Sequence, residues 1–376
     1  MKRILLALIC ALLLAELTLP ALAAEEAPEV SAAAAILIEA ESGEVLYEKN
    51  ADDRRLIAST TKIMTALVAL ERCELDQEIV IEEAWTGIEG SSMYLAAGQR
   101  MTARELLYGL MLASGNDAAV ALACVTAGSV GAFAELMNEK ARALGCDNTH
   151  FLNPSGLDQE GHYASARDLA LITQEAITRE DFCEIVATVS KTVGEHTFTN
   201  HNRLLRECEG VFGVKTGYTE ASGRSLVTSC ERDGMTLICV TLADPDDWND
   251  HKKLYDWAYG EWGRFSVLDK AAQWTVPVVG GEEETVAVGP GAELAVFCRP
   301  GEEITLVVEL PAFVYAKVEE GAAAGKITAW LGDEALGAAP LVYRATVEKT
   351  VAEEPTLAQR LEELFRFAER NGYALS

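Results

Sequence analysis

The feature that most constrains the fold is one long apolar stretch, "TARELLYGLMLASGNDAAVALACVTA", at residues 102–127. Its apolar residues recur with helical spacing, and only "SGND" interrupts them, where one helix ends and another begins. A second helical run follows at residues 131–145, and a further helix is predicted from Ala166. The chain of 376 residues is long enough for two domains and one sizeable core.

Strand patterns lie on both sides of this helical block. Residues 32–50 predict two strands around a turn at Ser42-Gly43. After Gly210 the apolar residues recur with period two, with a turn at Asp233-Gly234, and a helix at residues 248–262 follows. The expected class is therefore α+β, with helices packed on an antiparallel sheet.

The last third of the chain has a different composition. Short alternating runs separated by Gly, Pro and Glu predict a small all-β domain of sandwich type at residues 269–351. Residues 352–376 predict a weak amphipathic helix with one apolar face, made of Leu357, Leu361, Leu364, Phe365 and Ala368. The remaining body, residues 24–268, is expected to form one larger domain.

The N-terminus predicts export. Residues 1–23 combine a basic start, an apolar stretch and the small-residue pattern Ala21-Leu22-Ala23, which is typical of a secretory signal peptide. A membrane anchor is the alternative, and Glu16 within a short apolar run disfavours it. We expect an extracytoplasmic protein, in the cell wall or periplasmic space.

Charge and cysteine content exclude several classes of function. With 59 acidic and 31 basic residues the net charge is −28, which disfavours binding to nucleic acid and electrostatic attachment to anionic lipid. The eight cysteines after the signal peptide are scattered, without a C-x-x-C pair or histidines at metal-ligand spacing, so no metal site is expected.

Ser59-Thr60-Thr61-Lys62 opens a predicted helix, "LIASTTKIMTALVALE", whose apolar face carries Ile63, Leu67 and Leu70. Residues three apart share one face of a helix, so the amine of Lys62 can reach the hydroxyl of Ser59. An uncharged lysine there can activate the serine as a nucleophile. Taken alone, the pattern is more often a helix cap followed by a solvated lysine.

Two further motifs occur once each, later in the chain. Ser114-Gly115-Asn116 breaks the long helical run, where a hydroxyl and an amide can face a cleft, although such residues also make simple caps. Lys215-Thr216-Gly217 lies on a predicted strand, where it can bind a carboxylate or serve as an ordinary edge-strand lysine. The three motifs in this order, each on the element that its chemistry needs, form a strong joint signal.

Together with "GSSMYLAAGQ", "HFLNPSGLD" and "GVKTGYTEASGRSLV", these motifs make residues 31–265 resemble the D-alanyl-D-alanine carboxypeptidases, which are low-molecular-mass penicillin-binding proteins. The resemblance implies the serine β-lactamase/D,D-peptidase-like fold. It implies that the substrate is a peptidoglycan stem peptide ending in D-Ala-D-Ala, that β-lactams inhibit covalently, and that no cofactor is needed. The β-rich residues 269–351 resemble the family's C-terminal domain less specifically.

The resemblance also implies residue roles. Ser59 would be the nucleophile, Lys62 the general base and Ser114 a proton relay. Substrate-binding residues would be Asn116, Lys215, Thr216, Gly217 and Tyr218, with the backbone N–H groups of Ser59 and Tyr218 forming the oxyanion hole. Two features depart from the family: some members have His at the position of Tyr218, and the C-terminal tail is acidic where an amphipathic membrane anchor is usual.

Rival functions remain open at this stage. D,D-endopeptidase or transpeptidase activity would use the same motifs. A class A β-lactamase needs an E-x-x-x-N carboxylate, whereas Glu135 and Asn138 have the wrong spacing. A catalytically silent wall-binding module would be expected to carry a broken motif, and a Ser-His-Asp hydrolase lacks its G-x-S-x-G signature. We expect His162 and His196 to make structural hydrogen bonds, and Asp168 to cap or stabilise the helix from Ala166.

Overall fold

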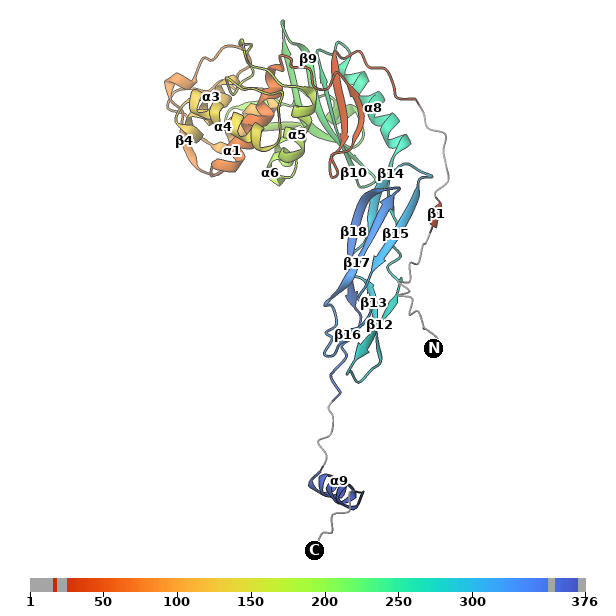
Figure 1. The fold of residues 1–376 in the computed structure, drawn as a ribbon. Coiled ribbons are helices and arrows are strands. Elements are labelled where there is room, and N and C mark those ends of the chain that lie inside the picture. Colours follow the sequence, from red (N-terminus) through yellow and green to blue (C-terminus); the bar gives the residue numbers. More distant parts are fainter. Residues whose placement is uncertain (1–15, 19–25, 351–355, 371–376) are drawn as a thin grey trace. The chain divides into compact units, whose positions relative to one another are not determined.

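A computed structural model describes residues 16–18, 26–350 and 356–370 (Figure 1). Apart from residues 16–18, the predicted signal peptide lies outside these residues. The chain divides into two compact units. The N-terminal unit is Leu22–Arg264, and the C-terminal unit comprises Phe265–Ser376 with Met1–Ala21. The division falls near residue 268, where the change in composition predicted a boundary.

The N-terminal unit is built on a five-stranded antiparallel sheet with the order β3-β2-β10-β9-β8. Its strands are β2 (Ala34–Glu39), β3 (Val45–Lys49), β8 (Val211–Thr219), β9 (Gly223–Arg232) and β10 (Met235–Leu242). Both predicted turns are present, with Gly43 and Gly234 at positive φ, which glycine adopts without strain. Every residue of β2 is buried, because helices cover both faces of the sheet (Figure 1).

Helices α1, α5 and α6 pack on one face of this sheet and α8 packs on the other (Figure 1). The helices are α1 (Lys62–Arg72), α2 (Ala103–Leu112), α3 (Asn116–Ala127), α4 (Val130–Ala143), α5 (Ala166–Ala176), α6 (Glu180–Ala187), α7 (Leu204–Glu207) and α8 (Asp247–Glu261). Two short 3₁₀ helices are η1 (Ala58–Thr61) and η2 (Glu83–Trp85), and two small ladders are β4 (Glu78–Val80) with β5 (Arg100–Thr102), and β6 (Ser190–Val193) with β7 (His196–Thr199).

The predicted break in the long apolar run is confirmed between α2 and α3. Thr102 and Glu105 form a capping box that starts α2, and Gly128 in the left-handed conformation ends α3. Between the helices, Ser114 has a φ of 59°, an uncommon backbone conformation for a residue other than glycine. The chain therefore turns sharply at this point.

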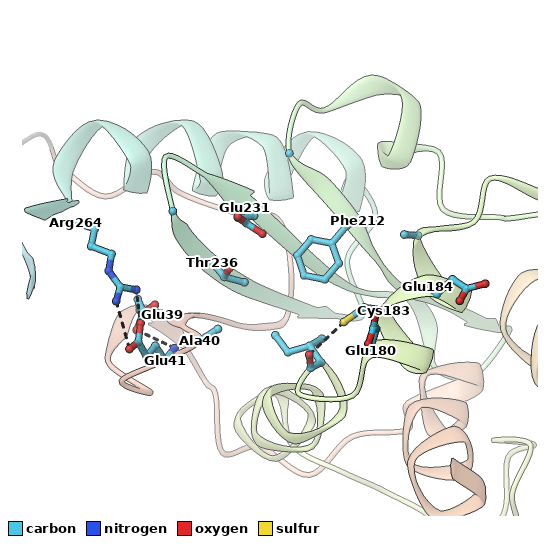
Figure 2. Close-up of a pocket in the computed structure, with 14 residues that line it drawn as sticks. Glu39, Ala40, Glu41, Glu180, Cys183, Glu184, Phe212, Glu231, Thr236 and Arg264 are labelled. Atoms are coloured by element: carbon cyan, nitrogen blue, oxygen red, sulfur yellow. Dashed lines mark hydrogen bonds and ion pairs between the residues drawn. The ribbon is translucent and has the colours of Figure 1, made fainter. Parts of the chain in front are cut away.

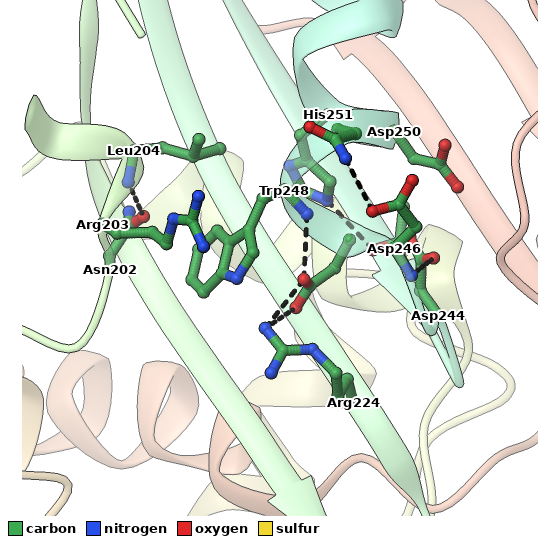
Figure 3. Close-up of polar contacts among 12 residues, drawn as sticks. Asn202, Arg203, Leu204, Arg224, Asp244, Asp246, Trp248, Asp250 and His251 are labelled. Atoms are coloured by element: carbon green, nitrogen blue, oxygen red, sulfur yellow. Dashed lines mark hydrogen bonds and ion pairs between the residues drawn. The ribbon is translucent and has the colours of Figure 1, made fainter. Parts of the chain in front are cut away.

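Arginines fix the start of α8 to the sheet. The Arg224 guanidinium donates to both carboxylate oxygens of the buried Asp247, each at 2.8 Å. Figure 3 shows the Trp248 ring between the guanidinium groups of Arg203 and Arg224, which lie 5.6 and 5.3 Å from its centroid. On the same side, the Asn202 side chain donates to the carbonyl of Gly213, in the strand that carries the Lys-Thr-Gly motif. These contacts attach the start of α8 to β9 and the segment around Asn202 to β8.

The C-terminal unit is all-β apart from its last helix, as predicted. Its strands are β1 (Glu16–Thr18), β12 (Trp274–Val279), β13 (Thr285–Pro290), β14 (Ala295–Cys298), β15 (Glu303–Glu309), β16 (Val314–Tyr315), β17 (Ala323–Leu331) and β18 (Glu334–Tyr343), and β11 (Gly263–Ser266) crosses the boundary between the units. Seven of these strands are hydrogen-bonded in the order β1-β15-β17-β18-β13-β12-β16, and β14 pairs separately with β11. The long β17–β18 hairpin links the strands on its two sides.

The final helix, α9 (Leu357–Arg370), lies within the predicted residues 352–376, and its large apolar side chains are exposed. Among the residues described, no single helix is long and apolar enough to cross a membrane, and α3 and α4 reach the required length only as a pair bent by 83°. All eight cysteines of the described residues are free thiols.

Candidate active site

The 3₁₀ turn η1 presents Ser59 directly before α1. Ser59 is partly exposed inside this turn, while Thr61 occupies the cap position of α1 without a side-chain capping bond. The cap interpretation of Ser59 is therefore wrong. Its hydroxyl oxygen lies 3.0 Å from Nζ of Lys62, the first residue of α1.

Lys62 is fully buried and its amine contacts three oxygens. These are Ser59 Oγ, Asn116 Oδ1 at 2.7 Å and the Ser155 carbonyl at 2.5 Å. Burial, and secondarily the charge of Lys215, hold the pKa of Lys62 well below its usual range, against an opposing effect of Asp117. A neutral amine has two N–H donors and one lone pair. In the neutral form, with Asn116 and Ser155 taking the two N–H donors, the lone pair would be directed at the hydroxyl of Ser59, whereas the protonated form donates to it.

A tight turn at residues 153–157 positions the Ser155 carbonyl. Asn153 Oδ1 accepts hydrogen bonds from the backbone N–H groups of Ser155 and Gly156, and Thr65 donates to the carbonyl of Pro154. Gly156 has a φ of 85°, and a Cβ there would lie 1.8 Å from the carbonyl oxygen of Ala58. Only glycine fits, because the turn touches the backbone of the nucleophile's own segment.

The Ser-Gly-Asn motif contributes a fully oriented amide. Asn116 Nδ2 donates to the carbonyl of Glu89 at 2.6 Å, so its Oδ1 faces Lys62. Asp117 is buried beside it and accepts hydrogen bonds from the backbone N–H groups of Met93 and Leu95. The hydroxyl of Ser114 is buried and has no hydrogen-bond partner among the described residues. A buried unpaired hydroxyl is costly, so it is available for a bound group.

The Lys-Thr-Gly motif lies on the edge strand β8, which packs against η1. Lys215 is buried and donates to the carbonyl of Thr216, and burial lowers the pKa of its amine to about 7. A Cβ on Gly217 would lie 3.2 Å from the backbone nitrogen of Ser59, so strand and nucleophile are in close contact. The side chain of Tyr218, the next residue, is exposed.

The structure thus brings the three motifs together. Lys62 contacts both Ser59 and Asn116, and Gly217 lies against Ser59. Three further groups near the motifs were not predicted from the sequence: the Ser155 carbonyl, the carboxylate of Asp117, and His201, whose pKa is lowered by burial and by Lys215. The one available signal was the turn sequence Asn-Pro-Ser-Gly at residues 153–156.

Other residues singled out in the sequence have structural contacts. His162 Nδ1 accepts from the N–H of Leu152, so the proton is on Nε2, which donates to Thr61 Oγ1 at 2.9 Å. Burial lowers the pKa of His162 to about 4, and the ring stays neutral. Asp168 lies in the first turn of α5, and its carboxylate accepts from the backbone of Asn148.

Residues Glu135 and Asn138 of the β-lactamase alternative lie within α4, where Asn138 pairs with the backbone of Phe151. Among the described residues, neither Glu135 nor Asn138 forms a hydrogen bond with a residue of the three motifs. No group of three or more His, Cys, Asp or Glu side chains among the described residues could hold a metal ion.

A pocket of about 860 Å³ lies at the other end of β8, away from the motif residues. Figure 2 shows Phe212 and Cys183 in it, with several glutamates around them. Its carboxylates are largely paired within the protein: Glu41 binds Arg264, and Glu184 accepts from the hydroxyl of Tyr108. None of the residues of the three motifs lines this pocket.

Comparison with known families agrees with this geometry. The profile described as "D-alanyl-D-alanine carboxypeptidase" matches residues 21–246, more than half of the chain. The chain belongs to the D-alanyl-D-alanine carboxypeptidase family. A second profile, "Penicillin-binding protein 5, C-terminal domain", matches residues 265–349. The family resemblance drawn from the motifs is confirmed, and so is the predicted α+β fold followed by an all-β domain.

The relatives cover different shares of the chain. D-alanyl-D-alanine carboxypeptidase DacF of Bacillus subtilis is 31% identical in an alignment of length 371 that covers 93% of this chain and 95% of the relative. DacA of Escherichia coli is 38% identical over 70% of this chain and 69% of its own. Penicillin binding protein 5 from Haemophilus influenzae has a solved structure with a TM-score of 0.67 and 29% identity, covering 86% of this chain and 100% of that one. The Streptomyces K15 DD-transpeptidase, with a TM-score of 0.60 and 34% identity, covers 62% and 99%.

Proposed function

We propose that this protein is a serine-type D-Ala-D-Ala carboxypeptidase, which removes the terminal D-alanine of peptidoglycan stem peptides through an acyl-enzyme. The observation that carries the proposal is the contact of Lys62 Nζ with Ser59 Oγ at 3.0 Å, made by an amine whose pKa is lowered by burial. A buried neutral amine next to a hydroxyl is a general base beside a nucleophile.

In the acylation step, Ser59 Oγ attacks the carbonyl carbon between the two D-alanines while its proton passes to Lys62. The backbone N–H groups of Ser59 and Tyr218 hold the developing oxyanion. The close packing of Gly217 against Ser59 supports this pairing of donors from two different elements. Collapse of the intermediate breaks the peptide bond, and the D-alanine nitrogen takes up a proton.

Ser114 relays that proton between Lys62 and the leaving nitrogen. Its buried hydroxyl without a partner supports this role, because substrate would supply the missing hydrogen bond. Asn116 orients Lys62 through Oδ1, whose second lone pair is available to a substrate N–H. Water then attacks the acyl-enzyme and regenerates Ser59.

Lys215 and Thr216 bind the terminal carboxylate of the substrate. A carboxylate next to Lys215 favours the charged ammonium, so binding the substrate raises the lowered pKa of this lysine. β-Lactams present an equivalent carboxylate and a strained amide, and they acylate Ser59. No cofactor is required by these steps.

The test is intact-mass labelling with penicillin. The wild-type protein is expected to gain one penicillin adduct, and Ser59→Ala is expected to gain none. Lys140→Ala, which changes a lysine of α4 that is paired with Glu71 and Glu175, is the labelled control. An unlabelled wild type, or equal labelling of Ser59→Ala, would refute the mechanism. Release of D-alanine from a pentapeptide then shows that the enzyme cleaves the D-Ala-D-Ala bond.

A D,D-transpeptidase or endopeptidase is the second candidate. The similarity to the Streptomyces K15 DD-transpeptidase, which is 34% identical with a TM-score of 0.60, favours it. Incubation of the pentapeptide with an excess of a D-amino acid separates the two. Predominant exchange of the terminal residue supports transpeptidation, and predominant release of D-alanine supports hydrolysis.

Within this proposal, residues 24–268 form the catalytic domain and residues 269–351 a C-terminal β domain, and the protein is exported by cleavage of residues 1–23. The exposed apolar side chains of α9 support a peripheral membrane contact. N-terminal sequencing of the exported protein checks the cleavage site, and its distribution between membrane and soluble fractions checks the contact.

A further inference from the structure

The C-terminal unit has a second exposed apolar surface, separate from α9. Val279, Phe313 and Tyr315 have exposed fractions of 46%, 49% and 67%. Val279 pairs with Tyr315 where β12 meets β16, and the rings of Phe313 and Tyr315 contact edge to face with centroids 5.4 Å apart. These three residues are called the aromatic patch. The surrounding sequence, "LPAFVYA" at residues 310–316, contains no charged side chain.

The aromatic patch lies where the described part of the unit ends. The backbone N–H of Thr350 donates to the carbonyl of Gly280, and its hydroxyl donates to the carbonyl of Gly281, directly after Val279. Residues 278–281, 314–318 and 347–350 are joined by such bonds at one end of the C-terminal unit (Figure 1). The chain therefore leaves this unit beside the aromatic patch.

Only residues 351–355 separate that point from the residues described at the start of α9. Six extended peptide steps, from residue 350 to 356, span at most about 20 Å. Two apolar surfaces are thus tethered within a short distance of each other. The other surface, on α9, consists of Leu357, Leu361, Leu364 and Phe365.

We infer that the aromatic patch of Val279, Phe313 and Tyr315 is a lipid-contact site, which enters the interfacial region of a membrane together with α9. The inference rests on the membrane contact proposed for α9 and names a second element that shares it. Tyrosine and other aromatic side chains are favoured at the level of the lipid head groups, where the ring is apolar and the hydroxyl is hydrated.

The charge of α9 explains why a second element is needed. Residues 356–370 carry three arginines and three glutamates, so the helix lacks the cationic face that strengthens binding to anionic lipid. Stable attachment of a peripheral protein usually requires two signals. The aromatic patch supplies apolar area at the point from which α9 is tethered, and this raises its effective concentration at the same surface.

The charges near the aromatic patch indicate which lipid it suits. Glu282, Glu283 and Glu284 follow Val279 and are exposed, while the nearby Lys317 is paired with Glu348 at 3.0 Å. An anionic bilayer would repel this end of the unit. The lipid surface that fits is therefore zwitterionic, and the attraction comes from apolar burial rather than from charge.

The experiment measures co-sedimentation of the full chain with phosphatidylcholine vesicles. The double variant Phe313→Ser/Tyr315→Ser is expected to bind about tenfold more weakly than the wild type, because it removes most of the apolar area of the aromatic patch. Val279→Ser should weaken binding by a smaller factor. Val80→Ser is the matched control, since Val80 is an equally exposed valine, at 50%, in the N-terminal unit. It should bind like the wild type.

A second variant separates the two proposals. Leu361→Glu/Leu364→Glu removes the apolar face of α9 and should also weaken binding. Loss of binding in this variant, with wild-type binding by Phe313→Ser/Tyr315→Ser, would overturn the lipid-contact site and leave the contact of α9 standing. A wild type that binds no vesicles would refute both. Tighter binding to phosphatidylglycerol vesicles that does not require the aromatic patch would also overturn the inference.

Folding and activity are monitored independently of lipid binding. Each variant should be labelled by penicillin at the wild-type rate, because Ser59 lies in the other unit. In a Phe313→Trp variant, lipids brominated in their acyl chains should quench the new tryptophan in addition to the background of the six native ones. Absence of additional quenching would contradict insertion.

Discussion

The two units differ in how many polar and charged side chains they bury. The N-terminal unit buries the side chains of many charged residues, among them Lys62, Asp117, Lys215, Asp247 and Asp250. In the described part of the C-terminal unit, Thr328 is the one buried residue of polar type, and the interior consists of Val, Leu, Ile and Ala with few exceptions. Burying a charge without compensation costs several kcal/mol. Asp247 and Asp250 are compensated by Arg224 and Lys253, whereas Lys62 and Lys215 belong to the motifs.

The same contrast appears at the surface. The C-terminal unit has a conventional apolar core but exposes aromatic side chains at the end where the chain leaves it. The unusual residues are thus buried charged side chains in the N-terminal unit and exposed aromatic side chains in the C-terminal unit. Buried titratable groups often mark a reaction site, and an exposed apolar patch often marks a contact surface. The predictions below test this distinction, from the largest expected effect to the smallest.

Removal of the buried base should have the largest effect. Lys62→Ala is expected to reduce the rate of penicillin acylation by about 10⁴-fold, because Ser59 loses its proton acceptor. The rate is followed by intact mass. Lys140→Ala is the control, since this lysine is also largely shielded but pairs with Glu71 and Glu175 away from the motifs. Acylation of Lys62→Ala within tenfold of the wild-type rate would show that another group takes the proton.

The tight turn that orients Lys62 gives the second test. Gly156→Ala places a Cβ 1.8 Å from the carbonyl oxygen of Ala58, and Gly156 has a φ of 85°. We expect a loss of about 3 kcal/mol or more in the free energy of unfolding, together with slower acylation, because the Ser155 carbonyl is displaced. Urea denaturation and mass spectrometry measure the two effects.

Gly161→Ala is the matched control for Gly156→Ala. Gly161 has nearly the same φ, 89°, but the nearest atom to an added Cβ is a side-chain carbon of Leu152 at 3.5 Å. This variant should lose about 1 kcal/mol for the left-handed backbone alone and keep its acylation rate. Equal losses in the two alanine variants would mean that backbone conformation, rather than the contact with the nucleophile's segment, determines the cost.

These residues show what could be predicted from the sequence. The three motifs fall on the helix start, helix junction and strand that were predicted, because helical and period-two patterns at those positions are long and regular. The Ser155 carbonyl was not predicted, because any residue type supplies a carbonyl and only the fold aims it at Lys62. The 3₁₀ turn that carries Ser59 was also missed, since a helix start and a 3₁₀ turn have similar local patterns.

Elsewhere, prediction from the sequence was limited by short elements and by strand pairing between distant parts of the chain. Helix α6 and the β6–β7 hairpin are too short to show a clear period. The alternating runs of the C-terminal unit predicted strands correctly, but alternation does not specify which strands pair. The pairing of β13 with β18, for example, joins strands that four other strands separate in the sequence, and the alternation does not indicate it.

The apolar core of the C-terminal unit provides the third test. Leu341→Ala, at a fully buried position, should lower the free energy of unfolding by about 3 kcal/mol through lost burial and the cavity left behind. The rate of penicillin acylation at 25 °C should stay unchanged. Leu361→Ala in α9, where the leucine is 45% exposed, should change the free energy of unfolding by less than about 0.5 kcal/mol. A lower acylation rate in Leu341→Ala would contradict the assignment of chemistry to the N-terminal unit alone.

The last prediction concerns the pH dependence of substrate binding, where the expected change in activity is the smallest. Burial lowers the pKa of Lys215 to about 7, from an ordinary value of 10.5. Between these two values the unfolded chain binds more protons than the folded one, so this lysine's contribution to stability rises with pH across that window. Its charge in the free enzyme has the opposite trend and is lost as the pH rises through about 7. Binding of a carboxylate therefore weakens on the alkaline side.

For a peptide with a free C-terminus, kcat/KM should accordingly fall by up to about tenfold per pH unit above the pKa of Lys215. Lys215→Arg should remove this fall even if its maximum activity is lower, because a guanidinium stays charged. A substrate with an amidated C-terminus should lack the fall in the wild type as well, since it has no carboxylate to bind. If the fall persists in Lys215→Arg, it belongs to another group of the N-terminal unit. The C-terminal unit cannot account for it, because none of its described residues of titratable type is buried except Cys298 and Tyr343, which lie in its own core.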